Sequence, residues 1–178
     1  MSDRVPKMMS VDDIRFVIDS FGKAARRAKI AGFDGIHLHG GNGYLLSEFN
    51  SPHSNRRDDE WGGDNKRRDK FILSVYEQIR DEVGNDFPVT ARIGITDAID
   101  CGLELSESMD RIKQLSDLGL DGVEVSYGIM RSYLQNIRPY VAVSRKRALR
   151  DKLLHRIFSQ GTPEAYYRNF ARSVKKHT

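Results

Sequence analysis

The sequence predicts an α/β fold in which parallel strands alternate with helices. Two segments, residues 31–39 (AGFDGIHLH) and 118–126 (LGLDGVEVS), repeat the same order of glycine, apolar residue, Asp-Gly and short strand pattern. Their glycines, Gly32 and Gly119, are 87 residues apart, and a further strand pattern at 88–93 (PVTARI) lies near the midpoint. A repeat of this length is typical of βα units, whose strands run parallel because right-handed crossovers join them.

A helix is expected before the first strand. Ser10 is followed three residues later by Asp13, which resembles a capping box, and the helix should run over residues 11–31. Residues 34–39 (DGIHLH) then suit a buried strand. Apolar residues recur through the helix at helical spacing, namely Ile14, Val17, Ile18, Phe21, Ala25 and Ala28.

A long loop follows the first strand. Residues 40–63 are rich in Gly, Asn, Ser, Pro and charged residues, and loops of this length in compact domains are usually functional. A second helix is predicted over about 65–83, ending at Gly84. Its apolar face would carry Ile72, Val75, Ile79 and Val83.

The next unit repeats the pattern. Residues 87–94 (FPVTARIG) form a strand pattern that Pro88 opens. Ser106 is the expected cap of a helix that Gly119 closes, and residues 121–126 form the third strand. The apolar residues of this helix are Met109, Ile112, Leu115 and Leu118.

The C-terminal part is less regular. We expect a loop over 127–140, a basic helix over 141–158 and a last helix with Thr162 as N-cap and Pro163 at its first position. In total, three strands are each followed by a helix. A closed (β/α)₈ barrel typically takes about 250 residues, so the 178-residue chain is either a small open sheet or a barrel segment. Either would leave two unpaired sheet edges and an exposed face of Val, Ile and Leu.

The composition limits the compartment. The single cysteine, Cys101, excludes an internal disulfide and a thiolate metal cluster, and fits a reducing compartment. No apolar run approaches the roughly 18 to 20 residues of a spanning helix, and the N-terminus has no apolar signal-peptide region. A cytoplasmic location and no membrane partner are the expectations that follow.

The charge is distributed unevenly. Residues 1–130 have a net charge of −6, whereas residues 131–178 have a net charge of +10. Such a basic block could bind nucleic acid, an anionic membrane or a phosphorylated cofactor. No recognised nucleic-acid motif accompanies it, so we favour the alternative of solvated helix faces and predict no nucleic-acid partner.

Three residues after the first strand could carry chemistry. His39, Asn42 and Tyr44 lie within HGGNGYLL, at the carboxyl end of the strand, where barrel enzymes build their sites. An imidazole and a carboxamide can both donate hydrogen bonds to one ligand oxygen, and a phenol can deliver a proton. Spacing alone is equally compatible with a polar corner between a strand and a loop.

The longer motif around these residues carries a family resemblance. Residues 39–63 (HGGNGYLLSEFNSPHSNRRDDEWGG), with AGFDGIHL before and FPVTARIG after, resemble the Old Yellow Enzyme family of FMN-dependent, NAD(P)H-using ene-reductases. The likeness is strong over about 8–128 and looser to 178. It implies a partial TIM (β/α)₈ barrel and an oxidoreductase that reduces the activated C=C bond of α,β-unsaturated carbonyl compounds.

The resemblance also implies residue roles. His39 and Asn42 would bind the substrate carbonyl oxygen, and Tyr44 would give a proton to the α-carbon. Polarising the carbonyl stabilises the enolate-like charge that develops as hydride leaves the flavin for the β-carbon. Arg92 would lie beside the flavin, where a cation favours the anionic reduced form. Without the resemblance, Arg92 would be interpreted as part of a surface ion pair.

The chain departs from the family pattern at three positions. Gly41 stands where alanine is usual, His37 where Glu is frequent and Glu48 where Gln is frequent. His37 and His39 share one strand face and could suggest a metal site. No convincing third ligand accompanies them, so we predict no metal.

The resemblance places the groups that hold the flavin ring and the FMN phosphate on strands outside this sequence. We therefore expect residues 1–178 to form a single domain, an incomplete barrel with flanking βα units missing at both ends, an incomplete FMN site and no activity alone. A complementing chain or self-association through open sheet edges could complete the barrel and its FMN site. The alternative is a non-catalytic remnant or interaction module that associates through those edges or through the basic tail.

Overall fold

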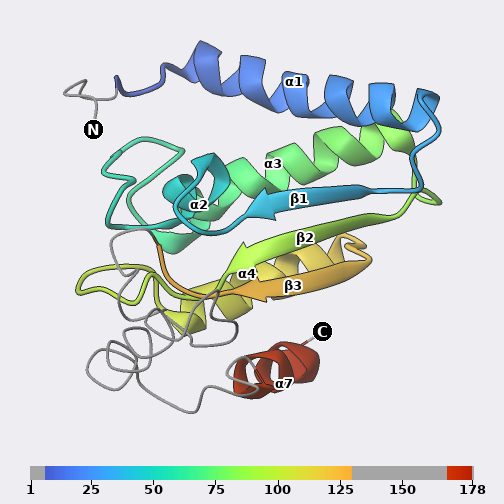
Figure 1. Cartoon of the computed structure of the whole chain (residues 1–178). Coiled ribbons are helices and arrows are strands. Elements are labelled where there is room, and N and C mark those ends of the chain that lie inside the picture. The colour runs from blue at the N-terminus through green and yellow to red at the C-terminus, as the bar shows by residue number, and fades with distance from the viewer. Residues whose placement is uncertain (1–6, 130–167, 178) are drawn as a thin grey trace, which may run out of the picture.

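A computed structural model describes the chain at residues 7–129 and 168–177. The predicted helix at 141–158, the Thr162 cap and most of the predicted loop at 127–140 lie outside these residues. The elements, in chain order, are α1 (Val11–Ile30), β1 (Ile36–Gly40), α2 (Leu45–Asn50), α3 (Asn65–Val83), β2 (Val89–Gly94), α4 (Leu105–Asp117), β3 (Gly122–Ser126) and α7 (Arg168–His177) (Figure 1).

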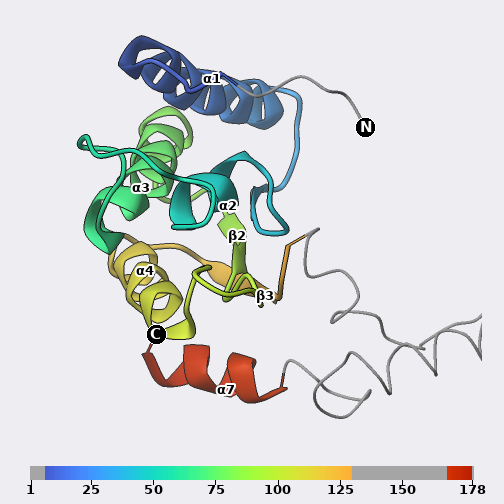
Figure 2. The ribbon, with the colours of Figure 1, turned by 90° about the vertical axis from the view of Figure 1, so that its left-hand side faces the viewer.

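The strands form the predicted parallel sheet, in the order β1-β2-β3. The register places His39 beside Arg92 and Arg92 beside Glu124. Helices α1, α3, α4 and α7 form an arc on one side of the strands (Figure 2). Helix α2 lies beyond the arrowhead of β1, at the carboxyl edge of the sheet (Figure 1). A parallel sheet covered by helices on one face is the arrangement of a partial (β/α)₈ barrel.

The hydrophobic core lies between the sheet and the helices. Leu38, Val89, Ala91 and Ile93 are at most 3% exposed and pack against the apolar face of α3. The predicted positions on α3 are all buried, as are Met109, Ile112 and Leu115 of α4, whereas Leu118 follows the helix and is exposed.

The prediction of an exposed face of Val, Ile and Leu is wrong. Alternate strand residues point to opposite faces, and the apolar set faces the helices. The face that the arc of helices leaves uncovered carries polar side chains instead, which are His37, His39, Thr90, Arg92 and Glu124. The open face of the sheet is therefore suited to polar ligands rather than to apolar association.

The first two helix starts agree with the sequence. Ser10 and Asp13 form the predicted capping box, in which the Asp13 backbone N–H donates to Ser10 Oγ at 3.1 Å and Ser10 N–H donates to Asp13 Oδ2 at 2.8 Å. Helix α3 begins after Asp64, whose carboxylate accepts from the Arg67 N–H at 3.0 Å. Gly84 ends it with a φ of 79°, in the left-handed region that glycine permits.

Two expectations about local structure are corrected. Ser106 does not cap α4, because the helix begins at Leu105, two residues before the start that a Ser106 cap implies, and its N-cap is Glu104. The Glu107 carboxylate, at the N3 position, accepts from the Glu104 N–H at 3.4 Å, which is one half of a capping box. The predicted loop at 40–63 also contains the six-residue helix α2, which buries Leu46 and Phe49 one turn apart.

A buried ion pair joins helices α3 and α4. Arg111 Nε lies 2.6 Å from Asp69 Oδ1, and both side chains are fully buried. Burial raises the pKa of Asp69, against the opposing effect of the Arg111 charge.

No helix of the described residues is long and apolar enough to cross a membrane.

Candidate active site

The candidate site is built on a sharp turn at the carboxyl end of β1. Asn42 and Gly43 have φ values of 62° and 79°, in the left-handed region that glycine and asparagine tolerate best. The Tyr44 N–H then donates to the Gly41 carbonyl at 3.3 Å, and α2 begins. Two consecutive left-handed residues reverse the chain, which brings Tyr44 back beside the end of the strand.

The turn brings His39 and Tyr44 together. Their ring centroids are 5.0 Å apart, with the planes tilted by 50°. Both residues are exposed, and Tyr44 retains 60% of its surface. Within residues 7–129 and 168–177, neither the imidazole nitrogens nor the phenol hydroxyl has a protein hydrogen-bond partner. These groups are therefore free to bind a ligand.

Asn42 is held from the third strand. Ser126, the last residue of β3, donates its hydroxyl to Asn42 Oδ1 at 3.1 Å. The Asn42 backbone also forms a parallel bridge with Ile129. The amide oxygen is thus occupied, and the amide nitrogen has no protein partner in the described part of the chain.

Arg92 lies next to His39 on the polar face of the sheet. Its Nη2 is 3.2 Å from Glu124 Oε1, so Arg92 does take part in an ion pair between neighbouring strands. Its Nε is buried and has no hydrogen-bond partner among the described residues. A buried N–H donor without a partner is uncommon, and here it leaves one donor for a ligand on this face.

Glu124, Thr90 and His37 extend the polar cluster, and sequence reasoning did not assign the first two to it. His37 Nδ1 lies 2.8 Å from Thr90 Oγ1, and its Nε2 lies 3.2 Å from Glu124 Oε2. The repeat of Asp-Gly before β1 and β3 aligns His37 with Glu124, and this signal could have placed both on one face. No group of three or more His, Cys, Asp or Glu side chains gathers as a metal site within the described ranges.

The second half of the motif builds the loop that follows α2. The Asn55 amide nitrogen donates to the carbonyls of Phe49 and Trp61 at 2.7 and 2.8 Å. Its amide oxygen accepts from the Arg57 N–H at 3.2 Å. One side chain thus joins three points of the loop, which gives this asparagine a structural role.

Arg57 closes the same loop. Its Nε and Nη2 donate to the two Asp59 carboxylate oxygens at 3.0 and 2.5 Å, and Nη1 donates to the Met9 carbonyl at 2.6 Å. The hydrogen bond from Arg57 lowers the pKa of Asp59. A Cβ on Gly62 would lie 2.5 Å from Arg57 Cβ, so only glycine fits there.

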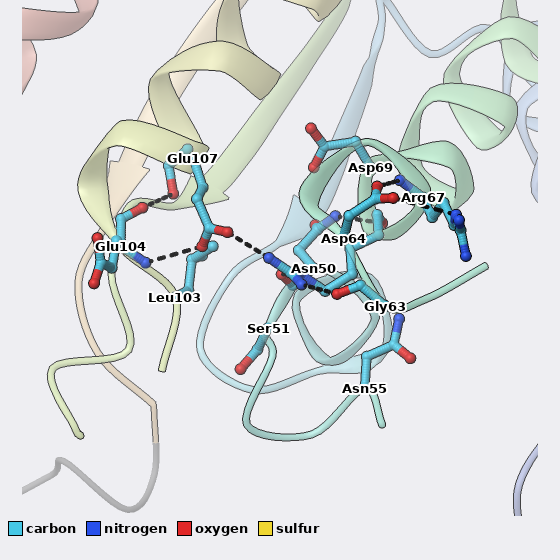
Figure 3. Close-up of polar contacts among 12 residues, drawn as sticks. Asn50, Ser51, Asn55, Gly63, Asp64, Arg67, Asp69, Leu103, Glu104 and Glu107 are labelled. Carbon is cyan, nitrogen blue, oxygen red and sulfur yellow. Dashed lines mark hydrogen bonds and ion pairs between the residues drawn. The ribbon is translucent and has the colours of Figure 1, made fainter. Parts of the chain in front are cut away.

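Two further contacts brace the loop against its neighbours. Ser51 donates to Asp97 Oδ2 at 2.5 Å, and the same oxygen accepts from the Leu103 N–H at 2.8 Å. Figure 3 shows Glu107 of α4 reaching toward the start of α3, near Asn50 and Gly63. The connecting residue is the buried Arg68, which forms an ion pair with Glu107 and donates to the carbonyls of Asn50 at 3.2 Å and Gly63 at 2.6 Å.

The fold and the site define the class of protein. A parallel sheet covered by helices, with polar groups gathered at the carboxyl ends of its strands, is the arrangement of (β/α)₈-barrel enzymes. The model of the NADH:flavin oxidoreductase / NADH oxidase family matches residues 1–152. The chain belongs to this family, and the resemblance to Old Yellow Enzymes is confirmed. FMN and NAD(P)H are the cofactors of the family.

Curated relatives agree with this assignment. The chain is 38% identical over 134 residues to an NADH oxidase of Thermoanaerobacter brockii. The aligned residues cover 75% of this chain and 21% of the relative. It is 42% identical over 125 residues to an NADPH dehydrogenase of Geobacillus sp. (strain WCH70), covering 70% of this chain and 36% of the relative. The chain thus spans about a fifth to two fifths of the length of these relatives.

Solved structures support the fold. The Old Yellow Enzyme homologue from Zymomonas mobilis superimposes with a TM-score of 0.67 at 24% identity, over 96% of this chain and 48% of the other. A 2-naphthoyl-CoA reductase superimposes with a TM-score of 0.73, also at 24% identity, over 96% of this chain and 23% of the other. The predicted partial barrel is confirmed.

Proposed function

We propose that this chain supplies the carbonyl-binding and proton-donating groups of an FMN-dependent NAD(P)H oxidoreductase that reduces the activated C=C bond of α,β-unsaturated carbonyl compounds. The observation that carries the proposal is the pairing of His39 and Tyr44. Their rings lie 5.0 Å apart at the carboxyl end of β1, and their polar atoms are free of protein partners in the described ranges.

Each group has a distinct role in the proposal. His39 and the Asn42 amide nitrogen donate hydrogen bonds to the substrate carbonyl oxygen, and negative charge that develops on this oxygen is stabilised by them. The Tyr44 hydroxyl donates a proton to the α-carbon. FMN, when bound, supplies the hydride.

Arg92 is the residue that we propose to contact FMN. Its buried Nε lacks a partner within the described residues and lies on the strand next to His39, so it fits an acceptor atom of the flavin ring. The Glu124 carboxylate, 3.2 Å from Nη2, would hold the guanidinium in place. The residues present therefore fit one edge of the cofactor.

The rest of the cofactor site forms a second part of the proposal. We infer that residues 1–178 act as one domain, a barrel segment whose FMN site is completed by further βα units. The chain's coverage of 21% and 36% of two relatives supports this inference. A segment of this kind would be inactive until the missing units are supplied.

The experiment follows the two half-reactions separately in the chain complemented with the missing βα units of a family member and reconstituted with FMN. In Tyr44→Phe, we expect NADPH to reduce the flavin at the parental rate. Reoxidation by cyclohex-2-enone should slow by about 10²- to 10⁴-fold, because proton donation is lost. Equal loss in both half-reactions would remove Tyr44 from this role, and a parent that cyclohexenone cannot reoxidise would contradict the ene-reductase proposal.

A second candidate function is that of an interaction module. The strand order leaves the outer edges of β1 and β3 without a strand partner among the described residues, and free edges favour association. Sedimentation velocity distinguishes the two candidates. A chain that forms a defined complex, and shows no enone-dependent flavin oxidation in it, would favour the module.

A further inference from the structure

We propose that Ser126 is a positioning residue that orients the Asn42 amide so that its NH₂ group faces the substrate carbonyl. The inference rests on the proposed function, in which Asn42 donates to that oxygen. A side-chain amide has a donor end and an acceptor end. Rotated by half a turn, Asn42 would present its own oxygen to the carbonyl oxygen, and the two would repel each other.

The hydrogen bond that sets this orientation comes from the third strand. Ser126 Oγ donates to Asn42 Oδ1 at 3.1 Å, across 84 positions of sequence. In this orientation Ser126 acts as the donor, Oδ1 is the inward end of the amide and Nδ2 is the outward donor. A hydrogen bond accepted at the amide oxygen also polarises the amide and strengthens its N–H groups as donors.

Ser126 is itself fixed in place. It is 2% exposed, and its carbonyl accepts from the Ile95 N–H at 2.9 Å, which ties the end of β3 to β2. A serine hydroxyl on a rigid strand end loses little freedom when it forms a bond. The orientation of the Asn42 amide is therefore fixed by a residue of the rigid sheet rather than by the exposed turn.

Gly41 makes room for this contact. A Cβ built on Gly41 would lie 3.0 Å from Ser126 Cβ and 3.1 Å from Ser126 Oγ, which is tighter than ordinary packing. The glycine thus lets the serine approach the turn closely. The Asn42 backbone is held by the same segment through its bridge with Ile129, so both the main chain and the side chain of Asn42 are set by the end of β3.

The first test measures the amide orientation without a ligand or cofactor. In ¹⁵N NMR spectra of the full chain, the Asn42 side-chain NH₂ signals are assigned by their loss in Asn42→Asp. In Ser126→Ala, we expect these signals to move, whereas Ser126→Thr, which keeps the hydroxyl, should retain the parental pattern. Unchanged Asn42 signals in Ser126→Ala would overturn the proposal.

The second test is a double-mutant cycle on the binding of cyclohex-2-enone to the FMN-loaded chain complemented with the missing βα units. Ser126→Ala should weaken binding about 2- to 12-fold, the size expected for one hydrogen bond. In the Asn42→Gly background the same change should have no effect, because there is no amide left to orient. The matched control is Ser108→Ala, which removes another fully buried serine hydroxyl, one that donates to the Ile95 carbonyl at 3.0 Å; it should bind like the parent.

The outcomes separate the two proposals. Equal weakening by Ser126→Ala with and without the Asn42 amide would show a merely structural role and overturn the positioning proposal alone. Parental binding by Ser126→Ala, in a chain where Asn42→Gly binds weakly, would have the same consequence. Parental binding by Asn42→Gly itself would overturn the proposed role of Asn42, and the positioning role with it.

Discussion

The two halves of the motif at residues 39–63 differ in how their polar groups are used. In the turn at 39–44, the imidazole of His39 and the hydroxyl of Tyr44 have no protein hydrogen-bond partner among the described residues. In the loop at 51–63, Asn55 and Arg57 place their side chains on three backbone carbonyls, a backbone N–H and a carboxylate.

From this difference we propose that the turn at 39–44, rather than the loop at 51–63, carries the chemistry. Polar groups that bond to the protein stabilise its fold, and removing one leaves its partners unsatisfied. Groups that are exposed and unpartnered do nothing for the fold and remain free for a ligand. We therefore propose that the turn binds the ligand. The longer second half of the motif builds the loop, although both halves belong to one family motif.

The largest effect on stability is expected from Asn55→Asp, which we compare with the same isosteric change at Asn42. Asn55→Asp replaces an NH₂ group that bonds to two carbonyls, at 2.7 and 2.8 Å, with a carboxylate oxygen that repels them. We expect a loss of about 3 kcal/mol in the free energy of unfolding. Asn42→Asp keeps the acceptor for Ser126 and should change stability by less than about 0.5 kcal/mol.

Urea denaturation of both variants measures the difference. Asn42→Asp should nevertheless lose enone binding, because a carboxylate cannot donate to the carbonyl oxygen. If the two variants were destabilised equally, the division of the motif into a ligand-binding turn and a structural loop would be wrong.

A smaller effect should appear in acid. The hydrogen bond from Arg57 lowers the pKa of Asp59 from its ordinary 3.8, so the stability that this carboxylate contributes is present above pH 3.8 and is lost as pH falls through the lowered value. Because the Asp59 side chain is 37% exposed, the contribution should stay below about 1 kcal/mol.

The measurement is the free energy of unfolding between pH 5 and pH 2 in the parent and in Asp59→Asn. The amide does not titrate in this range, so the difference between the two proteins should shrink as the pH falls. A constant difference over the whole range would contradict the role given to the ion pair.

The smallest effect is expected at Tyr44. Its side chain is 60% exposed and its hydroxyl has no protein partner in the described ranges. Tyr44→Phe should therefore change the free energy of unfolding by less than about 0.5 kcal/mol. Thermal denaturation followed by circular dichroism tests this. A clear destabilisation would mean that the phenol serves the fold, contrary to the comparison.

Much of the fold could be predicted because its signals are local. The Ser10 capping box, the glycine at position 84 and the apolar spacing of α3 each act within a few residues, and all are confirmed. The Ser106 cap was wrong because Glu104 and Glu107 compete for the same backbone groups, and spacing does not rank the two solutions.

The candidate site was only partly predictable. His39 and Tyr44 are close in sequence, and a turn after a strand was enough to bring their ring centroids to 5.0 Å from each other. The contacts from Ser126 and Glu124 depend on strand register across 84 and 87 positions, which periodicity does not set. The face of the sheet that stays exposed was misjudged for the same reason, since it depends on which alternate residues the helices cover.

The most direct test of the central claim is the infrared carbonyl stretch of ¹³C-labelled cyclohex-2-enone bound to the FMN-loaded chain complemented with the missing βα units. Hydrogen bonds to the oxygen from His39 and Asn42 should move the band to lower wavenumber than in buffer, and His39→Ala and Asn42→Gly should each reverse part of that shift. A band that stays at its position in buffer, or that neither variant moves, would contradict the account.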